Sequence, residues 1–372
     1  MSSNTLAVSR YDRQERITWW NQSKLKNSRV LVAGAGALGN EIVKNLAMLG
    51  VGHITVVDMD FIENTNLTRC IFFREVHEGL NKAKVLADEA SKLNSDVEIV
   101  GIATPVQNLG DAYLARFDLI LGGLDNREAR VWLSASARRF GKRMIDGAIE
   151  GLIGKVQVFA PGGPCYACTL TEQDWLMIAK RRSCALLGKD EILSGHTPTN
   201  ATTSSIIAGV QTQEAVKYLT GNESLAALEN RVWMLFGEEM SSFTSFLPLD
   251  EECPFHWEIN EPAGNSLVPN RLSDLMSKFP EAISIAFMDD FIEIESCPTC
   301  NDERILGFAA LLKNLGACAG CGTDKTVQSH NTVTRASGIL ELPIRSQYWP
   351  VESAVLLETP QDVVTWIVKG KE

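Results

Sequence analysis

The chain has 372 residues, 45% of them hydrophobic and 22% charged, which is typical of a soluble globular protein with two or three domains. Its net charge of −11 argues against nucleic acid or an anionic membrane as the main partner. No apolar run reaches membrane-spanning length, and the first residues lack a signal-peptide pattern, so we expect a cytoplasmic protein.

The first predicted element is a β-branched strand from Arg29 that ends in a glycine-rich turn with the spacing Gly34-x-Gly36-x-x-Gly39. Gly34 permits a tight turn, Gly36 lets a phosphate approach the backbone, and Gly39 lets the following helix pack closely. The N-terminus of that helix offers unpaired N–H groups to a phosphate. The next predicted strand ends at Asp58, an acid suited to a ribose hydroxyl. This pattern predicts a nucleotide site, with NAD as the default ligand.

Strands and helices alternate as far as about residue 160. Strands separated by helices imply a mainly parallel sheet with helices on both faces, a Rossmann-like doubly wound α/β fold. Because ligands of such sheets bind at the carboxyl ends of the strands, we expect Asp58 and Asp125 to meet at one site. The predicted strands are 97–102, 117–121 and 143–147, and the predicted helices are 80–93 and 126–140.

The pattern changes beyond Gly151, where an antiparallel strand over 154–160 is predicted. A polar connection follows, the crossover segment 169–203, before a helix over 204–219 and two strands that end near Leu247. A connection of this length suggests function or mobility.

The best linker, 260–266, divides the chain into a first domain, 1–259, and a small α+β domain, 267–372. In the second domain we expect a helix over 272–279 and late strands at 338–342 and 363–368.

Several residues have no role in a dehydrogenase. Asp60, Asn66 and Arg69 follow the second strand, Lys82 comes shortly after them, and Asp125 follows a later strand. Cations, amides and metal-binding acids around a nucleotide suit triphosphate chemistry better than hydride transfer.

Eight motifs stand in a fixed order between residues 10 and about 256. They are Arg10-Tyr11-x-Arg13-Gln14, Gly34-Ala-Gly36-Ala-Leu-Gly39, Asp58-x-Asp60, Asn66-Leu-x-Arg69, Gly79-x-x-Lys82-Ala, Leu124-Asp125-Asn126-x-x-x-Arg130, Gly154-x-Val and Pro164-Cys165-x-x-Cys168. With these motifs the sequence resembles the ubiquitin-activating-enzyme superfamily, which includes the adenylyltransferases for the sulfur carriers of molybdopterin and thiamine synthesis.

The resemblance implies a homodimer that uses ATP and Mg²⁺ to adenylate the C-terminal glycine of a ubiquitin-like protein. It implies that Asp58 holds the ribose, within a nucleotide site that also includes Asp60 and Asn66. Arg69 and Lys82 would hold the phosphates. The resemblance also implies that Asp125 holds Mg²⁺ and that Arg13 reaches into the partner subunit's site as an arginine finger.

Six of the nine cysteines form C-x-x-C pairs. In a cytoplasmic chain such pairs indicate metal binding in preference to disulfide bonds. Two sets of four ligands predict two structural Zn²⁺ sites. The first set, which resembles the zinc site of relatives, is Cys165, Cys168, Cys253 and His256. The second set, with zinc-ribbon spacing, is Cys297, Cys300, Cys318 and Cys321. A redox C-x-x-C is the alternative for the first pair, but a thioredoxin context is lacking.

Cys70 and Cys184 remain outside these sets. Cys184 follows Lys180-Arg-Arg in the crossover segment, where nearby cations favour a thiolate that can attack an acyl-adenylate. In several activating enzymes the thioester cysteine occupies this segment, so Cys184 is the candidate nucleophile, with a structural thiol as the alternative. Cys70 stands where the family usually has glutamine, and we interpret it as an ordinary small residue near the phosphates.

We therefore predict an activating enzyme that passes its partner to Cys184 as a thioester for a conjugating enzyme. The C-terminal domain resembles a shortened ubiquitin-fold domain that recruits such an enzyme, with a structural or dimer-stabilising appendage as the alternative. The other functions left open are an adenylyltransferase for a sulfur carrier, a nicotinamide-dependent oxidoreductase and, last, a non-catalytic scaffold.

Overall fold

The computed structural model describes residues 9–182, 198–257, 259–300, 303–305, 318, 320–323 and 325–370. These residues divide into two compact units. The first unit holds the described residues up to Thr104, from Arg116 to Thr171, and from 198 to Cys253. The second unit holds 105–115, 172–182 and the described residues from Pro254 onward.

The first unit is built on an eight-stranded sheet with the order β3-β2-β1-β4-β5-β6-β7-β8. The parallel strands are β1 (Arg29–Ala33), β2 (His53–Val57), β3 (Glu98–Ile102), β4 (Leu119–Gly122) and β5 (Arg143–Glu150). The antiparallel strands are β6 (Ile153–Phe159), β7 (Arg231–Phe236) and β8 (Ser241–Phe246). The chain order reverses at β1, between β2 and β4, so the predicted mixed α/β fold with a parallel-rich sheet is confirmed.

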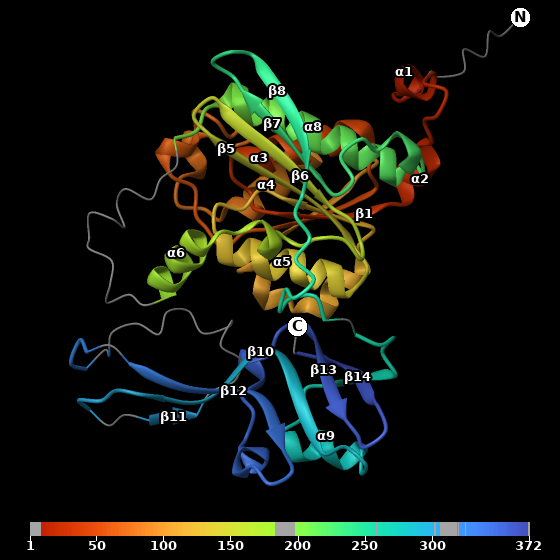
Figure 1. Ribbon diagram of the computed structural model, residues 1–372. Helices are drawn as coiled ribbons and strands as arrows, with labels where there is room; N and C mark the ends of the chain where they lie inside the picture. The colour runs from red at the N-terminus through yellow and green to blue at the C-terminus, as the bar shows by residue number, and fades with distance from the viewer. Residues whose placement is uncertain are drawn as a thin grey trace, which may run out of the picture. The chain divides into compact units, whose positions relative to one another are not determined.

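Helices cover both faces of this sheet (Figure 1). Figure 1 shows α3 and α8 on one face and α5 on the other, as expected for a doubly wound sheet. The central strands β1 and β4 are apolar and buried almost throughout because both of their faces are covered. The helices of this unit are α1 (Asp12–Glu15), α2 (Gln22–Asn27), α3 (Ala37–Leu49), α4 (Lys82–Ser91), α5 (Arg127–Arg139) and α8 (Ala201–Leu219).

The second unit contains a six-stranded sheet in which β11-β10-β13-β14-β9 are neighbours and β12 pairs with β10. One face of this sheet packs on α9 (Leu272–Lys278), whose Leu272 and Leu275 are fully buried. The segment 105–115 belongs to the same unit, because the buried Asp111 carboxylate accepts a hydrogen bond of 3.0 Å from the Ala354 N–H. The strands are β9 (Gly264–Leu267), β10 (Ser284–Ser296), β11 (Glu303–Ile305), β12 (Thr326–Thr334), β13 (Glu352–Glu358) and β14 (Val363–Lys369).

The predicted strand at 338–342 is wrong. Residues Gly338–Glu341 form the 3₁₀ helix η9, in which the Leu340 N–H bonds to the Ser337 carbonyl. Ile339 and Leu340 are both buried, and a strand would send these neighbouring side chains to opposite faces. The other late strand, at 363–368, is confirmed as part of β14.

Two connecting segments are more ordered than predicted. The predicted linker 260–266 ends in β9, whose Gly264–Leu267 pair in parallel with β14. The crossover segment begins with a helix, α6 (Glu172–Arg182). Within the described part of the chain, every helix is too short or too polar to span a bilayer.

Candidate nucleotide site and cysteine clusters

The glycine turn connects β1 to α3. Gly34 has a φ of +99°, which few residues other than glycine adopt, and its N–H donates to the Val57 carbonyl at 2.9 Å. A Cβ on Gly39 would lie 2.0 Å from the Gly34 carbonyl oxygen, so only glycine lets the helix start this close to the turn. A Cβ on Gly36 would meet nothing within 4 Å. Backbone conformation and close packing thus explain why positions 34 and 39 are glycine, whereas the space beside Gly36 is open.

This difference predicts opposite results for two alanine variants. Gly39→Ala forces two backbone segments apart and is expected to destabilise the first unit by more than about 3 kcal/mol. Gly36→Ala has room for its methyl group and an ordinary φ of −74°, so we expect unchanged thermal unfolding but weaker nucleotide binding. Calorimetry with and without ATP measures both effects, and equal destabilisation by the two variants would contradict the prediction.

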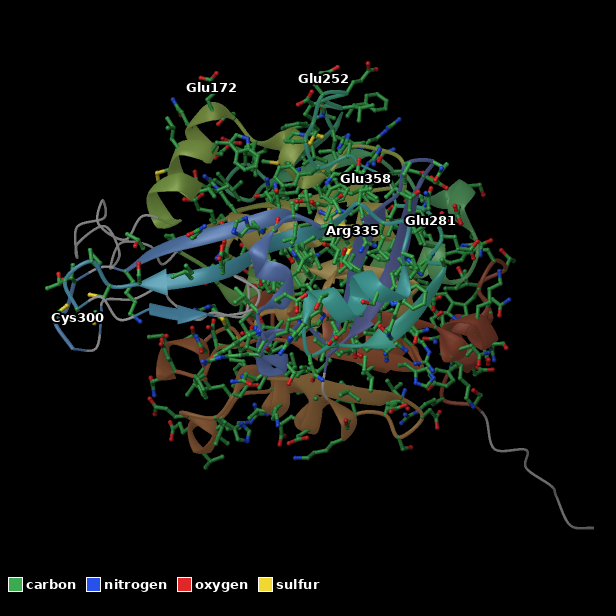
Figure 2. All side chains as sticks on the ribbon, turned by 90° about the horizontal axis from the view of Figure 1, so that it is seen from below. Glu172, Glu252, Glu281, Cys300, Arg335 and Glu358 are labelled. Carbon is green, nitrogen blue, oxygen red and sulfur yellow. The ribbon has the colours of Figure 1, made fainter. Side chains whose placement is uncertain are left out.

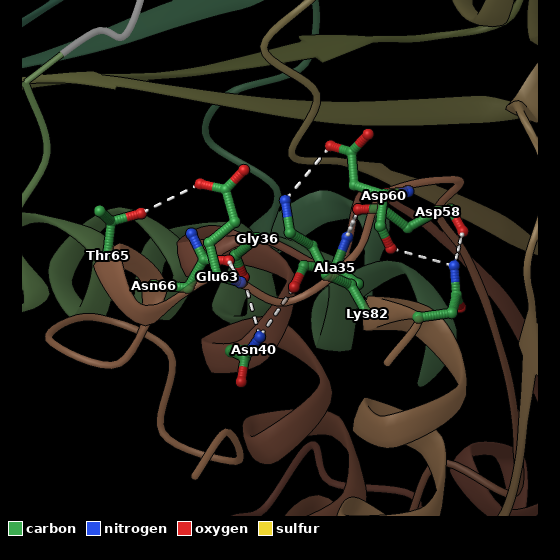
Figure 3. A network of polar contacts seen from close by, with 10 residues as sticks. Ala35, Gly36, Asn40, Asp58, Asp60, Glu63, Thr65, Asn66 and Lys82 are labelled. Carbon is green, nitrogen blue, oxygen red and sulfur yellow. Dashed lines mark hydrogen bonds and ion pairs between the residues drawn. The ribbon is translucent and has the colours of Figure 1, made fainter. Parts of the chain in front are cut away.

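Asp58 follows β2 and is tied to the glycine turn (Figure 3). Its carboxylate accepts hydrogen bonds from the Ala35 N–H at 2.6 Å and from the Asp60 N–H at 2.8 Å. Burial raises the pKa of this carboxyl, and the two backbone hydrogen bonds oppose the rise. One acid therefore fixes the glycine turn to the loop after β2.

Lys82 begins α4 and contacts the same loop. Its Nζ lies 3.2 Å from Asp60 Oδ2, and its backbone N–H donates to the Asp60 carbonyl at 2.9 Å. The Asn81 side chain donates to the carbonyls of Asp58 and Asp60, both at 3.0 Å. The structure thus brings Asp58, Asp60 and Lys82 together beside the glycine turn, as Figure 3 shows.

Asn66 and Arg69 lie on the segment after this loop, at the 3₁₀ helix η1 (Asn64–Asn66). The buried Asn66 accepts a hydrogen bond from the Glu63 N–H at 3.0 Å, and the half-buried Arg69 donates to the Thr65 carbonyl. Both side chains therefore bond within their own segment. Cys70 is buried, and burial raises the pKa of its thiol to about 11.

A thiol with this pKa is expected to resist alkylation. At pH 8 a pKa of about 11 leaves about one molecule in a thousand as thiolate, the form that reacts. Peptide mass mapping after iodoacetamide treatment of the native protein at pH 8 is expected to find Cys70 unmodified until denaturant is added. Rapid labelling of Cys70 in the native protein would contradict its burial.

Asp125 lies in the loop after β4, and its side chain is exposed. Gly123, two residues before Asp125, packs against the glycine turn. A Cβ on Gly34 would lie only 2.7 Å from the Gly123 carbonyl oxygen. Asn126 caps α5 by accepting a hydrogen bond from the Glu128 N–H at 2.8 Å. The loops that carry Asp58 and Asp125 thus both border the glycine turn.

Arg13 is exposed on α1, away from these residues. The neighbouring Gln14 donates to the Leu49 carbonyl at 2.9 Å, which anchors α1 to the C-terminal end of α3. The glycine turn lies at the other end of α3, which has 13 residues and is therefore about 20 Å long. Within one chain the structure does not bring Arg13 to the glycine turn.

The predicted ligand sets form two clusters, and in each the four ligand atoms lie within 4.8 Å of one another. In the first cluster, Cys165 Sγ lies 3.8 Å from both Cys168 Sγ and Cys253 Sγ. In the second, the sulfur pairs Cys297–Cys321 and Cys300–Cys318 are 3.4 and 3.9 Å apart. These distances are too long for disulfides and close to the roughly 3.8 Å edge of a tetrahedral metal–thiolate site. Both clusters could therefore hold a metal ion.

The two clusters differ in exposure. Cys165 and Cys253 of the first cluster are buried, whereas Cys300 and Cys321 of the second are exposed. The paired strands β10 (Ser284–Ser296) and β12 (Thr326–Thr334) form an arm, the β10–β12 arm, and Figure 2 shows Cys300 at its end. The remaining predicted site residue, Cys184, lies outside the described residues.

The glycine turn stands where the strand order reverses, the place at which doubly wound proteins bind nucleotides. Its open side at Gly36 and the adjoining acids and lysine define a nucleotide-binding α/β protein. The comparison with protein families narrows this class. The chain belongs to the ThiF family, whose model matches residues 6–254.

Individual relatives agree with this membership. "Adenylyltransferase and sulfurtransferase MOCS3-1" of Zea mays is 32% identical over 202 residues, which cover 54% of this chain and 41% of that protein. The "NEDD8-activating enzyme E1 catalytic subunit" of Arabidopsis thaliana is 38% identical over 156 residues, 38% of this chain and 34% of that protein. The structure of E. coli MccB with AMPCPP and MccA matches with a TM-score of 0.55 and 25% identity, covering 66% of this chain and 74% of that chain.

The resemblance to the ubiquitin-activating-enzyme superfamily is thus confirmed, and relatives from both its activating and its sulfur-carrier branches match. The matched part spans less than half the length of these two curated relatives.

Proposed function

We propose that this chain is an ATP-dependent activating enzyme that adenylates the C-terminal glycine of a ubiquitin-like protein. The observation that carries this proposal is the set of polar loops around the open glycine turn of a ThiF-family chain. These loops bring Asp58, Asp60 and Lys82 together and bring the Asp125 loop against Gly34. Family membership favours adenylyl transfer over the nicotinamide-dependent alternative.

In the proposed reaction the glycine carboxylate attacks the α-phosphate of ATP and pyrophosphate leaves. Charge that builds on the phosphate oxygens is stabilised by fixed cations, a role that suits Lys82 and Arg69. Asp58 would hold the ribose and Asp125 the Mg²⁺, which neutralises phosphate charge when bound. Asp60 supports this arrangement by fixing the Lys82 ammonium, and Asn66 by shaping the segment that carries Arg69.

A homodimer accounts for Arg13. Because α1 is anchored at the far end of α3, Arg13 is remote from the glycine turn of its own chain. We propose that it enters the partner subunit's site as an arginine finger, which would add a cation where pyrophosphate departs.

Zinc is the metal we propose for both cysteine clusters. Thiolate-rich tetrahedral sites favour Zn²⁺, and four protein ligands leave no open position for a substrate. Both sites would therefore be structural. A redox role for Cys165 and Cys168 is disfavoured because Cys253 and His256 complete a four-ligand set around them.

We propose further that Cys184 receives the activated carboxyl group as a thioester, for transfer to a conjugating enzyme. The thiolate attacks the acyl carbon of the adenylate, the C–S bond forms, and AMP leaves. The similarity to MOCS3-1 supports a second candidate, in which the acyl-adenylate of a sulfur carrier meets a sulfur donor and no thioester with this chain forms.

Intact mass measurement under non-reducing conditions tests these proposals. The protein is mixed with MgATP and a ubiquitin-like protein ending in glycine that is encoded nearby. The expected product is an adduct that a thiol reductant removes, that Cys184→Ser abolishes and that the control Cys70→Ser retains. Pyrophosphate release without an adduct would favour the sulfur-carrier candidate. The absence of ATP–pyrophosphate exchange with both classes of partner would contradict adenylation.

A further inference from the structure

Arg130 is the last residue of the Leu124-Asp125-Asn126 motif, yet it is only 8% exposed. Its Nε donates to the Leu124 carbonyl at 2.8 Å, and one terminal nitrogen donates to the same oxygen. The same terminal nitrogen also donates to the Gly147 carbonyl at 3.2 Å. The guanidinium therefore binds the backbone carbonyl immediately before Asp125 and links this carbonyl to β5.

Two further partners lie on the other side of the guanidinium. Asp146 of β5 is fully buried, and its Oδ2 lies 3.7 Å from Arg130 Nη1. Among the described residues neither carboxylate oxygen of Asp146 has a hydrogen-bond partner, so its nearest compensation is the charge of Arg130. Burial raises the pKa of the Asp146 carboxyl, and Arg130 opposes this rise. An acid with so few partners is costly to bury unless it holds the cation.

The second partner is Tyr166, which links Arg130 to the first cysteine cluster. Arg130 Nη1 donates to the Tyr166 hydroxyl at 3.4 Å, and the guanidinium lies 5.6 Å from the centre of the Tyr166 ring. Tyr166 follows Cys165 directly, in the 3₁₀ helix η5 (Tyr166–Thr169), and its N–H bonds to Ser134 of α5. The cysteine turn is thereby joined to the helix that carries Arg130.

We propose that Arg130 is a positioning residue for the Asp125 loop, and that Asp146 and the cysteine-turn residue Tyr166 hold it in place. The inference rests on the proposed role of Asp125 as a Mg²⁺ ligand. Asp125 itself is exposed, so the position of its carboxylate depends on the backbone that Arg130 fixes through the Leu124 carbonyl. Loss of groups that orient a metal ligand typically weakens metal binding by about 10- to 100-fold.

Arg130→Lys tests the proposal because it keeps the charge that faces Asp146 and removes the planar fork that clasps Leu124. We measure Mn²⁺ affinity by electron paramagnetic resonance with a non-hydrolysable ATP analogue, and the Mg²⁺ requirement of ATP–pyrophosphate exchange. We expect the Mn²⁺ affinity to fall by about 10-fold or more and the Mg²⁺ concentration needed for exchange to rise by the same factor, with ATP affinity in the absence of metal unchanged. Tyr166→Phe removes a single hydroxyl and is expected to weaken metal affinity by about threefold.

Arg143→Lys is the matched control. Arg143 begins β5, the strand of Asp146, and its guanidinium lies over the Tyr218 ring and pairs with Glu223 and Glu229. These described partners are outside the Asp125 loop. The Arg143→Lys variant is expected to keep normal metal affinity. Equal effects of Arg130→Lys and Arg143→Lys, or normal metal affinity in both Arg130→Lys and Tyr166→Phe, would overturn the proposal.

Asp125→Asn separates this proposal from the one on which it rests. Weak Mn²⁺ binding in Asp125→Asn together with normal binding in Arg130→Lys would refute the positioning role alone. Normal Mn²⁺ binding in Asp125→Asn would remove the metal role of Asp125 and the positioning proposal with it. Because Mn²⁺ binding is measured without turnover, either result is independent of whether the chain adenylates a ubiquitin-like protein.

Discussion

Lys82→Ala is expected to lower the rate of ATP–pyrophosphate exchange by about 10²- to 10³-fold while leaving the protein folded. Lys82 starts α4 beside the glycine turn, and its ammonium is held 3.2 Å from Asp60 Oδ2. This pairing fixes the cation before ATP arrives, so little reorganisation is needed when charge develops on the phosphates. An alanine at the same position removes the charge and keeps a good helix former.

The cost to stability is expected to be small, because Asp60 is half exposed and pairs of this kind contribute about 0–1 kcal/mol. Lys84→Ala is the matched control, since Lys84 lies in the same first turn of α4 with an exposed side chain. Exchange at saturating ATP and thermal unfolding are measured for both variants. Wild-type exchange in Lys82→Ala, or an equal loss in Lys84→Ala, would show that the cation beside Asp60 does not serve catalysis.

The elements of the first unit could be predicted from local patterns. The central strands are continuous apolar runs because both faces of a parallel sheet are buried, and polar turns separate them from the helices. The glycine spacing was equally informative, because Gly34 and Gly39 are required by backbone geometry and not by a ligand. Eight ordered motifs then indicated the superfamily that the comparisons confirm.

Local patterns could not show how polar side chains are shared between binding and structure. Asp58 and Asn66 were interpreted as nucleotide ligands, and the structure also gives each of them backbone groups to hold. Arg130 closes one of the eight motifs without a role that the sequence assigns to it, and the fold buries it against Asp146. The only sequence signal for this pair was an acid inside the apolar run of β5.

The second unit was harder to predict because its sheet is assembled from distant segments. β9 joins β14 across about 100 residues, so no local pattern shows that the predicted linker ends in a strand. Gly338–Leu342 has the composition of a strand, but Ile339 and Leu340 both pack into the same core cluster, whereas adjacent residues of a strand point to opposite faces. The spacing of the cysteines, in contrast, predicted which four sulfurs gather on the β10–β12 arm.

Removal of the first cluster is expected to have the larger structural effect of the two proposed zinc sites. Elemental analysis is expected to find about two zinc ions per chain in the wild type and about one in Cys165→Ser or in Cys300→Ser. Structural zinc binding is worth about 10–16 kcal/mol in small peptides, so loss of either site is expected to destabilise the part of the chain that it joins.

The difference between the sites follows from the loops they close. Cys165 and Cys253 are buried and stand 88 residues apart, whereas Cys297 and Cys321 are separated by 24 and the latter is exposed. The longer loop alone favours the first site by about 1 kcal/mol of closure entropy. Burial adds to this, because a serine at position 165 puts a polar hydroxyl in a buried place and leaves Cys168 and the buried Cys253 as thiols without the metal that would join them.

We therefore expect Cys165→Ser to lower the unfolding temperature of the first unit by about 10 °C or more and to weaken ATP-analogue binding, whereas Cys300→Ser leaves both unchanged. Calorimetry and nucleotide titration on the two variants, each checked for its zinc content, make the comparison. If the wild-type protein contained no zinc, the proposal of zinc in both clusters would be wrong. The contrary result is a Cys165→Ser variant that loses its zinc and keeps the wild-type unfolding temperature. That result would show that the turn after β6 holds its place without the metal, so that zinc at the first cluster does not stabilise the fold.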